Sequence, residues 1–189
     1  MEISQPRNAF RELFFKHASE DGKLEAKELK EFISELSRTE LNEPLKFSTE
    51  TCRSLVTMMD RNRSGGMNYG EALKMWREIK EYIAVFQQFD VDKVGEIKIP
   101  QFDKLLRSLA STLGFPVNRR IEMAIVRRYA DRDDKIRLQD FIIIICKLTL
   151  MHQIFKEQQA KSGASDSTSF SMNEVKTAVV VSYQRACRA

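Results

Sequence analysis

The sequence predicts an all-α fold, built of about eight helices joined by short polar turns. Apolar residues recur three and four positions apart along most of the chain, which is the spacing of one buried helix face. Only 4 Pro and 7 Gly occur among 189 residues, too few for the many tight turns of a β-sandwich. Hydrophobic residues make up 42% of the chain and charged residues 31%, a composition typical of a globular protein with a sizeable core.

Local signals define several of the helix ends. Pro6 suits a first helical turn, where its missing N–H has no partner to lose. Ser48 is expected to cap the third helix, and Gly114, followed by Pro116, to end the fifth. The predicted helices cover residues 6–17, 29–36, 48–59, 69–89, 99–113, 121–129, 138–155 and 172–186, with apolar faces that include Phe14, Phe32, Leu55, Trp76, Leu106, Ile121, Ala124, Ile145 and Val179.

Two polar stretches are predicted as loops. Residues 37–46 contain Asn42 and Pro44, and residues 158–169 are rich in serine. The longest unbroken apolar run, residues 141–146, has six residues, whereas a membrane-spanning helix needs about 20. We therefore expect no stable membrane insertion.

Cysteine usage and charge exclude several classes of protein. Cys52, Cys146 and Cys187 are scattered, with no zinc-type spacing and no motif of a catalytic nucleophile around them. We expect free thiols in a reducing, cytoplasmic compartment and no enzymatic activity of the chain itself. The net charge of +4 is mild, and the densest basic stretch, residues 119–132, lacks interleaved aromatic residues. This pattern indicates a solvated helix surface and no nucleic-acid partner.

The clearest functional motif is the twelve-residue stretch 60–71. Oxygen-bearing side chains stand at positions 1, 3 and 5, Gly65 stands at position 6 for the sharp turn, and a glutamate stands at position 12. This is the spacing of an EF-hand calcium loop, in which position 7 contributes its carbonyl oxygen. The predicted Ca²⁺ ligands are Asp60, Asn62, Ser64, Gly66 and Glu71.

This loop is one of several similar turns. Each contains an apolar residue that stands between polar residues just before a helix, the place where paired EF-hand loops form a short β-bridge. Five such residues occur, which predicts five hands, with the first pairing with the second and the third with the fourth. The five are Leu24, Met67, Ile97, Ile136 and Phe170.

With these features the chain resembles a penta-EF-hand domain, closest to the C-terminal calmodulin-like domain of calpain large subunits. The resemblance covers about residues 8–175, is close in the first three hands and weak in the last, and the degenerate later loops indicate an atypical calpain. It implies one domain over residues 1–189, with hands at about 8–36, 48–82, 70–112, 117–155 and 140–187. The matching stretches are residues 10–14 (FRELF), 18–29 (ASEDGKLEAKEL), 48–56 (STETCRSLV), 58–61 (MMDR), 76–86 (WREIKEYIAVF) and 89–93 (FDVDK).

The resemblance implies a second calcium site in the first hand. The family's first loop has eleven residues, which correspond here to residues 18–28. Its ligands would be the carbonyl oxygens of Ala18 and Lys23 and the carboxylates of Asp21 and Glu28.

The later loops are degenerate. In the third, residues 90–101, Asp90, Asp92 and Glu96 are doubtful ligands, because Val94 offers no side-chain oxygen and Gln101 replaces the glutamate. The fourth, residues 131–140, has Lys135 and Arg137 at ligand positions and Asp140 in place of a longer glutamate. The fifth, residues 158–174, has lost the acidic pattern. We expect weak or no binding at these three loops.

The odd fifth hand predicts a dimer. With no fifth partner within the chain, its short strand and apolar helix face invite association. In the resembled family, fifth hands pair across a two-fold axis, in homodimers or with the small calpain subunit. The predicted interface residues are Phe170, Val175, Val179 and Tyr183. The alternative is that the last helix packs on its own lobe.

Three functions follow from these patterns. The first is a calcium-binding regulatory and dimerisation domain of a calpain-like cysteine protease, whose catalytic residues lie in upstream domains of the same protein. The second is a free-standing penta-EF-hand adaptor related to sorcin. The third is a dimerisation scaffold that no longer senses calcium, which the degenerate later loops favour and the intact second loop disfavours.

Overall fold

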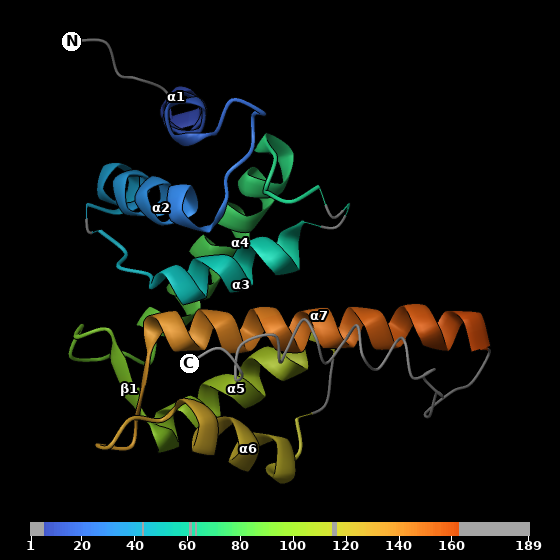
Figure 1. The fold of residues 1–189 in the computed structure, drawn as a ribbon. Helices are drawn as coiled ribbons and strands as arrows, with labels where there is room; N and C mark the ends of the chain where they lie inside the picture. Colours follow the sequence, from blue (N-terminus) through green and yellow to red (C-terminus); the bar gives the residue numbers. More distant parts are fainter. Residues whose placement is uncertain (1–5, 43, 61, 63, 115–116, 163–189) are drawn as a thin grey trace. The chain divides into compact units, whose positions relative to one another are not determined.

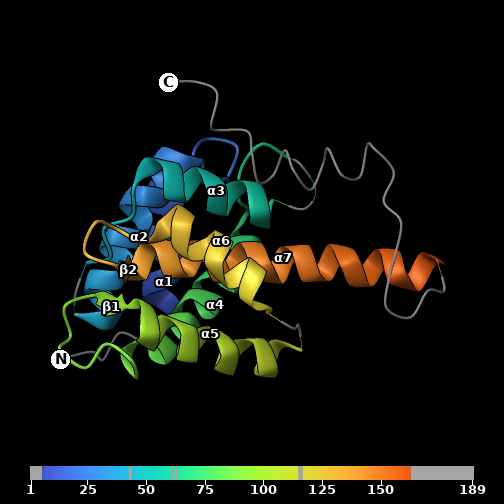
Figure 2. The ribbon, with the colours of Figure 1, turned by 90° about the horizontal axis from the view of Figure 1, so that it is seen from below.

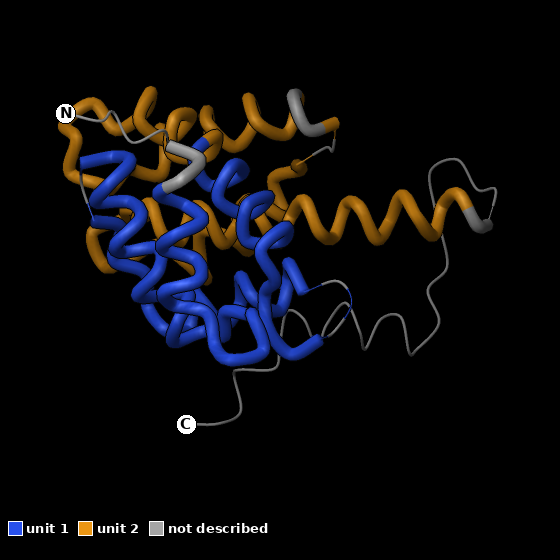
Figure 3. Tube along the Cα trace, turned by 90° about the horizontal axis from the view of Figure 1, so that it is seen from above, with its two compact units in different colours: residues 1–80 blue, residues 81–189 orange. Residues whose placement is uncertain are grey.

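A computed structural model describes residues 6–42, 44–60, 62, 64–114 and 117–162 (Figure 1). The described part is all-α with one small antiparallel sheet, which confirms the predicted fold class. It divides into two compact units, residues 1–80 and 81–189 (Figure 3). The elements are α1 (Pro6–His17), α2 (Ala26–Leu41), α3 (Thr49–Met59), α4 (Tyr69–Gln87), β1 (Glu96–Lys98), α5 (Ile99–Leu113), α6 (Arg119–Tyr129), β2 (Lys135–Arg137) and α7 (Leu138–Ser162).

Unit 1 is built around an edge-to-face aromatic cluster. Phe10 and Phe14 of α1 meet Phe32 of α2 with ring centroids 5.2 and 6.1 Å apart, and both also pack against Tyr69 of α4. The loops before α2 and α4 are joined by an isolated β-bridge between Leu24 and Met67. Both residues are fully buried, so the predicted pairing of the first and second hands is confirmed.

Unit 2 repeats this arrangement with a longer strand pair. β1 and β2 are antiparallel, with Ile97 opposite Ile136, and α5 and α7 begin directly after the two strands (Figure 2). Both isoleucines are buried, as predicted for the third and fourth hands. Residues 141–146 of α7 are buried too, and Phe141 packs on Phe86 at the end of α4.

Two predicted loops are partly helical. α2 continues to Leu41, and Asn42 ends it in a left-handed conformation with φ 60°. The polar residues that suggested a loop include Ser37, which is buried: its hydroxyl donates to the Ser34 carbonyl and accepts the Leu45 N–H at 2.7 Å. α7 likewise continues through residues 158–162. The rest of that predicted loop, the predicted helix 172–186 and all four predicted interface residues lie outside the described residues.

Helix α6 differs from prediction in its burial. None of its residues is buried, and Ile121 and Ala124, predicted on an inner face, are exposed. Four arginines, at 119, 120, 127 and 128, surround most of this short helix, so only Ile125, Val126 and Tyr129 turn partly inward. α6 therefore covers the unit without contributing to its core.

One described helix, Leu138–Ala160, is long and apolar enough to cross a membrane by length and composition alone, with a mean hydropathy of 1.4 over its best window. The short length of the longest apolar run predicted that no segment could span a membrane as a helix. By this test of length and composition that prediction was wrong. The same test also selects core helices of soluble proteins, and residues 141–146 lie in the core of unit 2. The finding is weak evidence for a membrane span.

The two described cysteines, Cys52 and Cys146, are both buried. Burial raises the pKa of the Cys52 thiol to about 12, so this thiol stays neutral and packs as a small apolar side chain. Cys187 lies outside the described residues.

The Leu24–Met67 bridge predicts a strict requirement at Gly66. A Cβ atom there would lie 3.0 Å from the Cβ of Lys23 and 3.3 Å from the Leu24 carbonyl oxygen, tighter than most packed contacts, so the neighbouring loop would have to shift. We expect Gly66→Ala to destabilise unit 1 by about 1–2 kcal/mol, measured as a lower Tm by circular dichroism.

Gly70, in the first turn of α4, is the matched control. A Cβ atom there would meet only Asn68 Oδ1 at 3.4 Å, an ordinary contact. Alanine is the better helix former, so Gly70→Ala should leave Tm unchanged or raise it slightly. Equal melting temperatures for the two variants would contradict the close approach of the two loops.

Candidate metal centre

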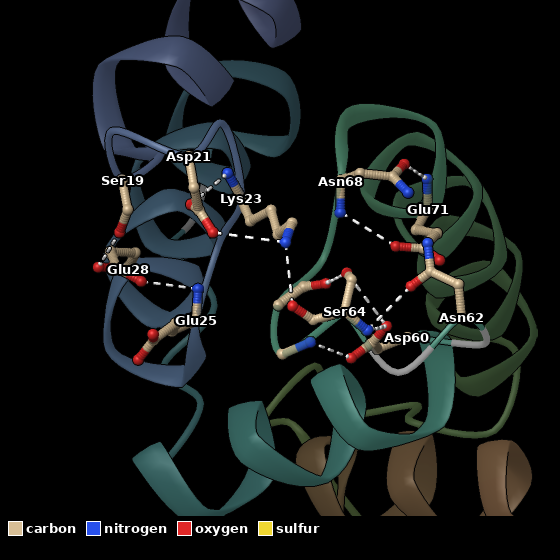
Figure 4. Close-up of polar contacts among 12 residues, drawn as sticks. Ser19, Asp21, Lys23, Glu25, Glu28, Asp60, Asn62, Ser64, Asn68 and Glu71 are labelled. Atoms are coloured by element: carbon tan, nitrogen blue, oxygen red, sulfur yellow. Dashed lines mark hydrogen bonds and ion pairs between the residues drawn. The ribbon is translucent and has the colours of Figure 1, made fainter.

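The entry of the second loop is held by its first acid. The two carboxylate oxygens of Asp60, at the end of α3, accept the N–H groups of Ser64 at 2.8 Å and Gly65 at 2.9 Å. Asn62 Oδ1 also accepts the Ser64 N–H, at 3.0 Å. Gly65 has φ 94°, a conformation that L side chains rarely adopt, so the turn requires glycine. These contacts curl the oxygen-bearing side chains toward the inside of the loop (Figure 4).

The exit of this loop is held by a reciprocal pair. Glu71 Oε2 accepts the Asn68 N–H and Asn68 Oδ1 accepts the Glu71 N–H, each at 3.0 Å, so the first turn of α4 is capped. Figure 4 shows the carboxylate of Glu71 turned back toward the side chains of Asn62 and Ser64. The structure thus brings together the predicted ligands of the second loop.

The first loop has a different turn but a similar closure. The Ser19 N–H donates to the Lys23 carbonyl at 2.9 Å, and Gly22 takes φ 73° at the corner. Glu28, in the first turn of α2, connects both ends of the loop. Its two oxygens accept the Ser19 hydroxyl at 2.8 Å and the Glu25 N–H at 2.6 Å. Asp21 is more open, with 60% of its side chain exposed.

The third loop repeats the entry of the second and replaces its exit. Buried Asp90 accepts the N–H groups of Val94 at 3.1 Å and Gly95 at 2.8 Å. Gln101 accepts the Lys98 N–H at 2.9 Å through Oε1, and its Nε2 donates to the Phe89 carbonyl at 3.4 Å. A neutral amide therefore joins the exit of this loop to its entry, a contact that a glutamate could not make because it has no donor.

The other two doubtful ligands of the third loop point elsewhere. Asp92 is exposed. The carboxylate of Glu96 lies 3.2 Å from Lys135 Nζ and 3.6 Å from Arg137 Nε, across the strand pair. Glu96 therefore pairs with cations of the fourth hand, which were themselves predicted to stand at ligand positions.

The fourth loop shares the turn of the first. The Asp131 N–H donates to the Lys135 carbonyl at 2.9 Å, as Ser19 does to Lys23, and Asp134 takes the left-handed corner at φ 56°. Asp131 Oδ1 accepts the N–H groups of Lys135 and Asp133, both at 2.9 Å, and these donors lower the pKa of its carboxyl group. Burial raises the pKa of Asp140, which makes it a poor replacement for a bidentate glutamate.

Only a few carboxylates are available as ligands at the first two loops. No group of three or more His, Cys, Asp or Glu side chains that could hold a metal gathers anywhere in the described part of the chain. The first and second loops each place two carboxylates among carbonyl, amide or hydroxyl oxygens. Oxygen-only donor sets suit calcium, and a low charge count places its affinity in the weak range.

Comparisons with known proteins now give these loops a context. No model of a known protein family matches the chain. The calpain-1 catalytic subunit of Homo sapiens is 30% identical over 148 residues, which cover 78% of this chain and 20% of the relative. For that of Oryctolagus cuniculus the identity is also 30%, with 48% of the relative covered, so the chain spans about half or less of these relatives.

A solved structure matches almost the whole chain. It is a homolog of programmed cell death 6 protein from Leishmania major Friedlin, with a TM-score of 0.62 over 96% of this chain and 92% of that one, at 18% identity. The chain is therefore similar in sequence to part of the calpain-1 catalytic subunit and shares the fold of that solved structure. Calcium fits the oxygen donors of the first two loops.

One contact of the site was not predicted from the sequence. The side chain of Lys23, expected to contribute only its carbonyl, reaches the carbonyl oxygen of Ser64 in the second loop. Only the register of the Leu24–Met67 bridge brings these two residues together, so no local pattern around Lys23 could have indicated it.

The amide contact of Gln101 generates a prediction for the third loop. Glutamate at this position would lose the hydrogen bond to the Phe89 carbonyl. We therefore expect Gln101→Glu to lower the free energy of unfolding in a calcium-free buffer by about 1 kcal/mol, measured as a lower Tm. The added carboxylate should then make Tm rise more with calcium than it does in the wild type.

Gln87→Glu is the control, since Gln87 is exposed and the substitution adds the same charge near the end of α4. It should not reproduce the calcium-dependent rise. A Gln101→Glu variant that melts like the wild type without calcium would refute the amide contact.

Proposed function

We propose that the chain is the calcium-binding regulatory and dimerisation domain of a larger, atypical calpain-like cysteine protease of the cytoplasm. The observation that carries this proposal is the second loop, in which Asp60 and the Asn68–Glu71 pair position oxygen donors from both ends. The sequence relatives are named catalytic subunits, and the chain covers only part of them. The catalytic residues of the proposed protease would lie in its other domains.

Two glutamates would transmit calcium binding to the fold. Glu28 and Glu71 each lie in the first turn of a helix and each also caps a backbone N–H of that turn. A carboxylate that moves toward the loop entry must release this cap and draw the helix start with it. Calcium would thus alter the directions of α2 and α4, which is the form of regulation expected of a sensor.

A calcium-independent scaffold is the second candidate. The amide of Gln101 and the backbone bonds of Asp131 hold the third and fourth loops through contacts within the protein. These contacts need no ion, so they favour a structural role for unit 2 whatever unit 1 binds.

Calorimetric titration with calcium separates the two candidates. We expect the wild type to bind one ion at each of the first two loops, with dissociation constants of about 10⁻⁵ to 10⁻³ M because each loop offers only two carboxylate ligands. Glu28→Gln and Glu71→Gln should each remove one binding event. Glu31→Gln, an exposed position on α2, removes the same charge and should remove none.

Failure of the wild type to take up calcium at millimolar concentration would reject the regulatory role and support the scaffold. Submicromolar binding at the second loop would contradict the charge argument alone.

Dimerisation through the fifth hand has its own test. We expect light scattering to give about twice the chain mass of 22.0 kDa at high concentration. Val179→Asp, at the predicted interface, should return the mass to that of one chain, because a buried unpaired carboxylate is costly. Met151→Asp, at an exposed position of α7, is the control and should leave the dimer intact. A wild-type mass of 22.0 kDa would refute the dimer.

A further inference from the structure

The pairing of the first two hands places Lys23 of the first loop beside the second loop. It follows the left-handed corner at Gly22 and immediately precedes Leu24, which bridges to Met67. The close approach of the loops at this point is the one that would crowd a side chain at Gly66. The Lys23 side chain therefore lies between the two loops, with its ammonium group facing Asp21 on one side and the second loop on the other, as Figure 4 shows.

The ammonium group of Lys23 contacts one oxygen of each loop. Nζ donates to the Ser64 carbonyl at 2.9 Å and lies 3.5 Å from Asp21 Oδ2. Only 27% of this side chain is exposed, which is low for a lysine. The other oxygen of Asp21 accepts the backbone N–H of Lys23 at 3.2 Å. Both oxygens of Asp21 are thus engaged by the same residue.

We propose that Lys23 is an internal cation of the paired loops, which competes with calcium for Asp21 and ties the first loop to the second through the Ser64 carbonyl. The competition rests on the proposed function, whereas the tie between the loops does not. A divalent ion bound by Asp21 would repel the ammonium group and take the oxygen that it faces. Lys23 therefore lowers the calcium affinity of the first loop.

The same residue couples the two loops. Once its acid is taken, the ammonium group is better hydrated in solvent than beside a single carbonyl oxygen, so the contact with Ser64 weakens. The hydroxyl of Ser64 bonds to Asp60 Oδ1 and to the Gly66 carbonyl, at 3.4 and 3.2 Å, within the predicted ligand set of the second loop. Occupancy of the first loop would thus reach the second, and linkage makes the effect reciprocal.

The test compares Lys23→Met with Lys27→Met. Both variants remove one positive charge from the same loop, but Lys27 is exposed on α2 and its ammonium group makes no hydrogen bond or ion pair among the described residues. Calorimetric calcium titration should show that the first loop binds calcium about two- to fivefold more tightly in Lys23→Met than in Lys27→Met. This is the size of effect expected when a partly exposed ion pair is removed. Glu28→Gln in each background identifies the event that belongs to the first loop.

Amide hydrogen exchange without calcium is the second measurement. The N–H groups of Leu24 and Met67, which bond across the bridge at 2.9 Å, should exchange several times faster in Lys23→Met than in the wild type or in Lys27→Met. Equal calcium affinities in the two variants would overturn the competition, and equal exchange rates would overturn the tie. If no variant binds calcium at the first loop, the competition fails and the exchange rates alone decide the tie, whereas the proposed function fails only if the second loop binds no calcium either.

Discussion

Backbone pairing between neighbouring loops is the constraint on which the rest of this structure depends. One pair, Leu24 with Met67, lies in the core of unit 1, and the other, Ile97 with Ile136, lies in the core of unit 2. All four side chains are buried. Strand pairs this short are not stable alone and persist only because helices pack around them. The pairing in turn fixes where those helices begin. Loop geometry and core packing therefore depend on each other within each unit.

Each pair combines two kinds of loop. The second and third loops are entered through an aspartate that accepts two consecutive N–H groups, from Ser64 and Gly65 or from Val94 and Gly95. The first and fourth share a tighter turn with a left-handed corner, at Gly22 and at Asp134. The short loop comes first in one unit and second in the other. Backbone capping keeps each type intact even where side chains suited to calcium have been replaced.

The sequence predicted most of the fold, because apolar periodicity and the bridge residues are both local patterns. It failed where a polar residue is buried, as at Ser37, and where arginines surround a helix, as in α6. For the candidate site it predicted the second-loop ligands that the structure gathers. It missed the contacts of Lys23 and Glu96, since each reaches a residue about 40 positions away whose proximity only the fold creates.

The neutral Gln101 has a consequence for the lifetime of the protein. A loop crowded with carboxylates repels itself when calcium is scarce and opens often, which exposes its backbone to cellular proteases. Here the third loop is closed by an amide, and Lys135 and Arg137 of the fourth offset the charge of Glu96. Unit 2 is thereby suited to remain folded between calcium signals, so its turnover in a resting cell would not follow the calcium concentration.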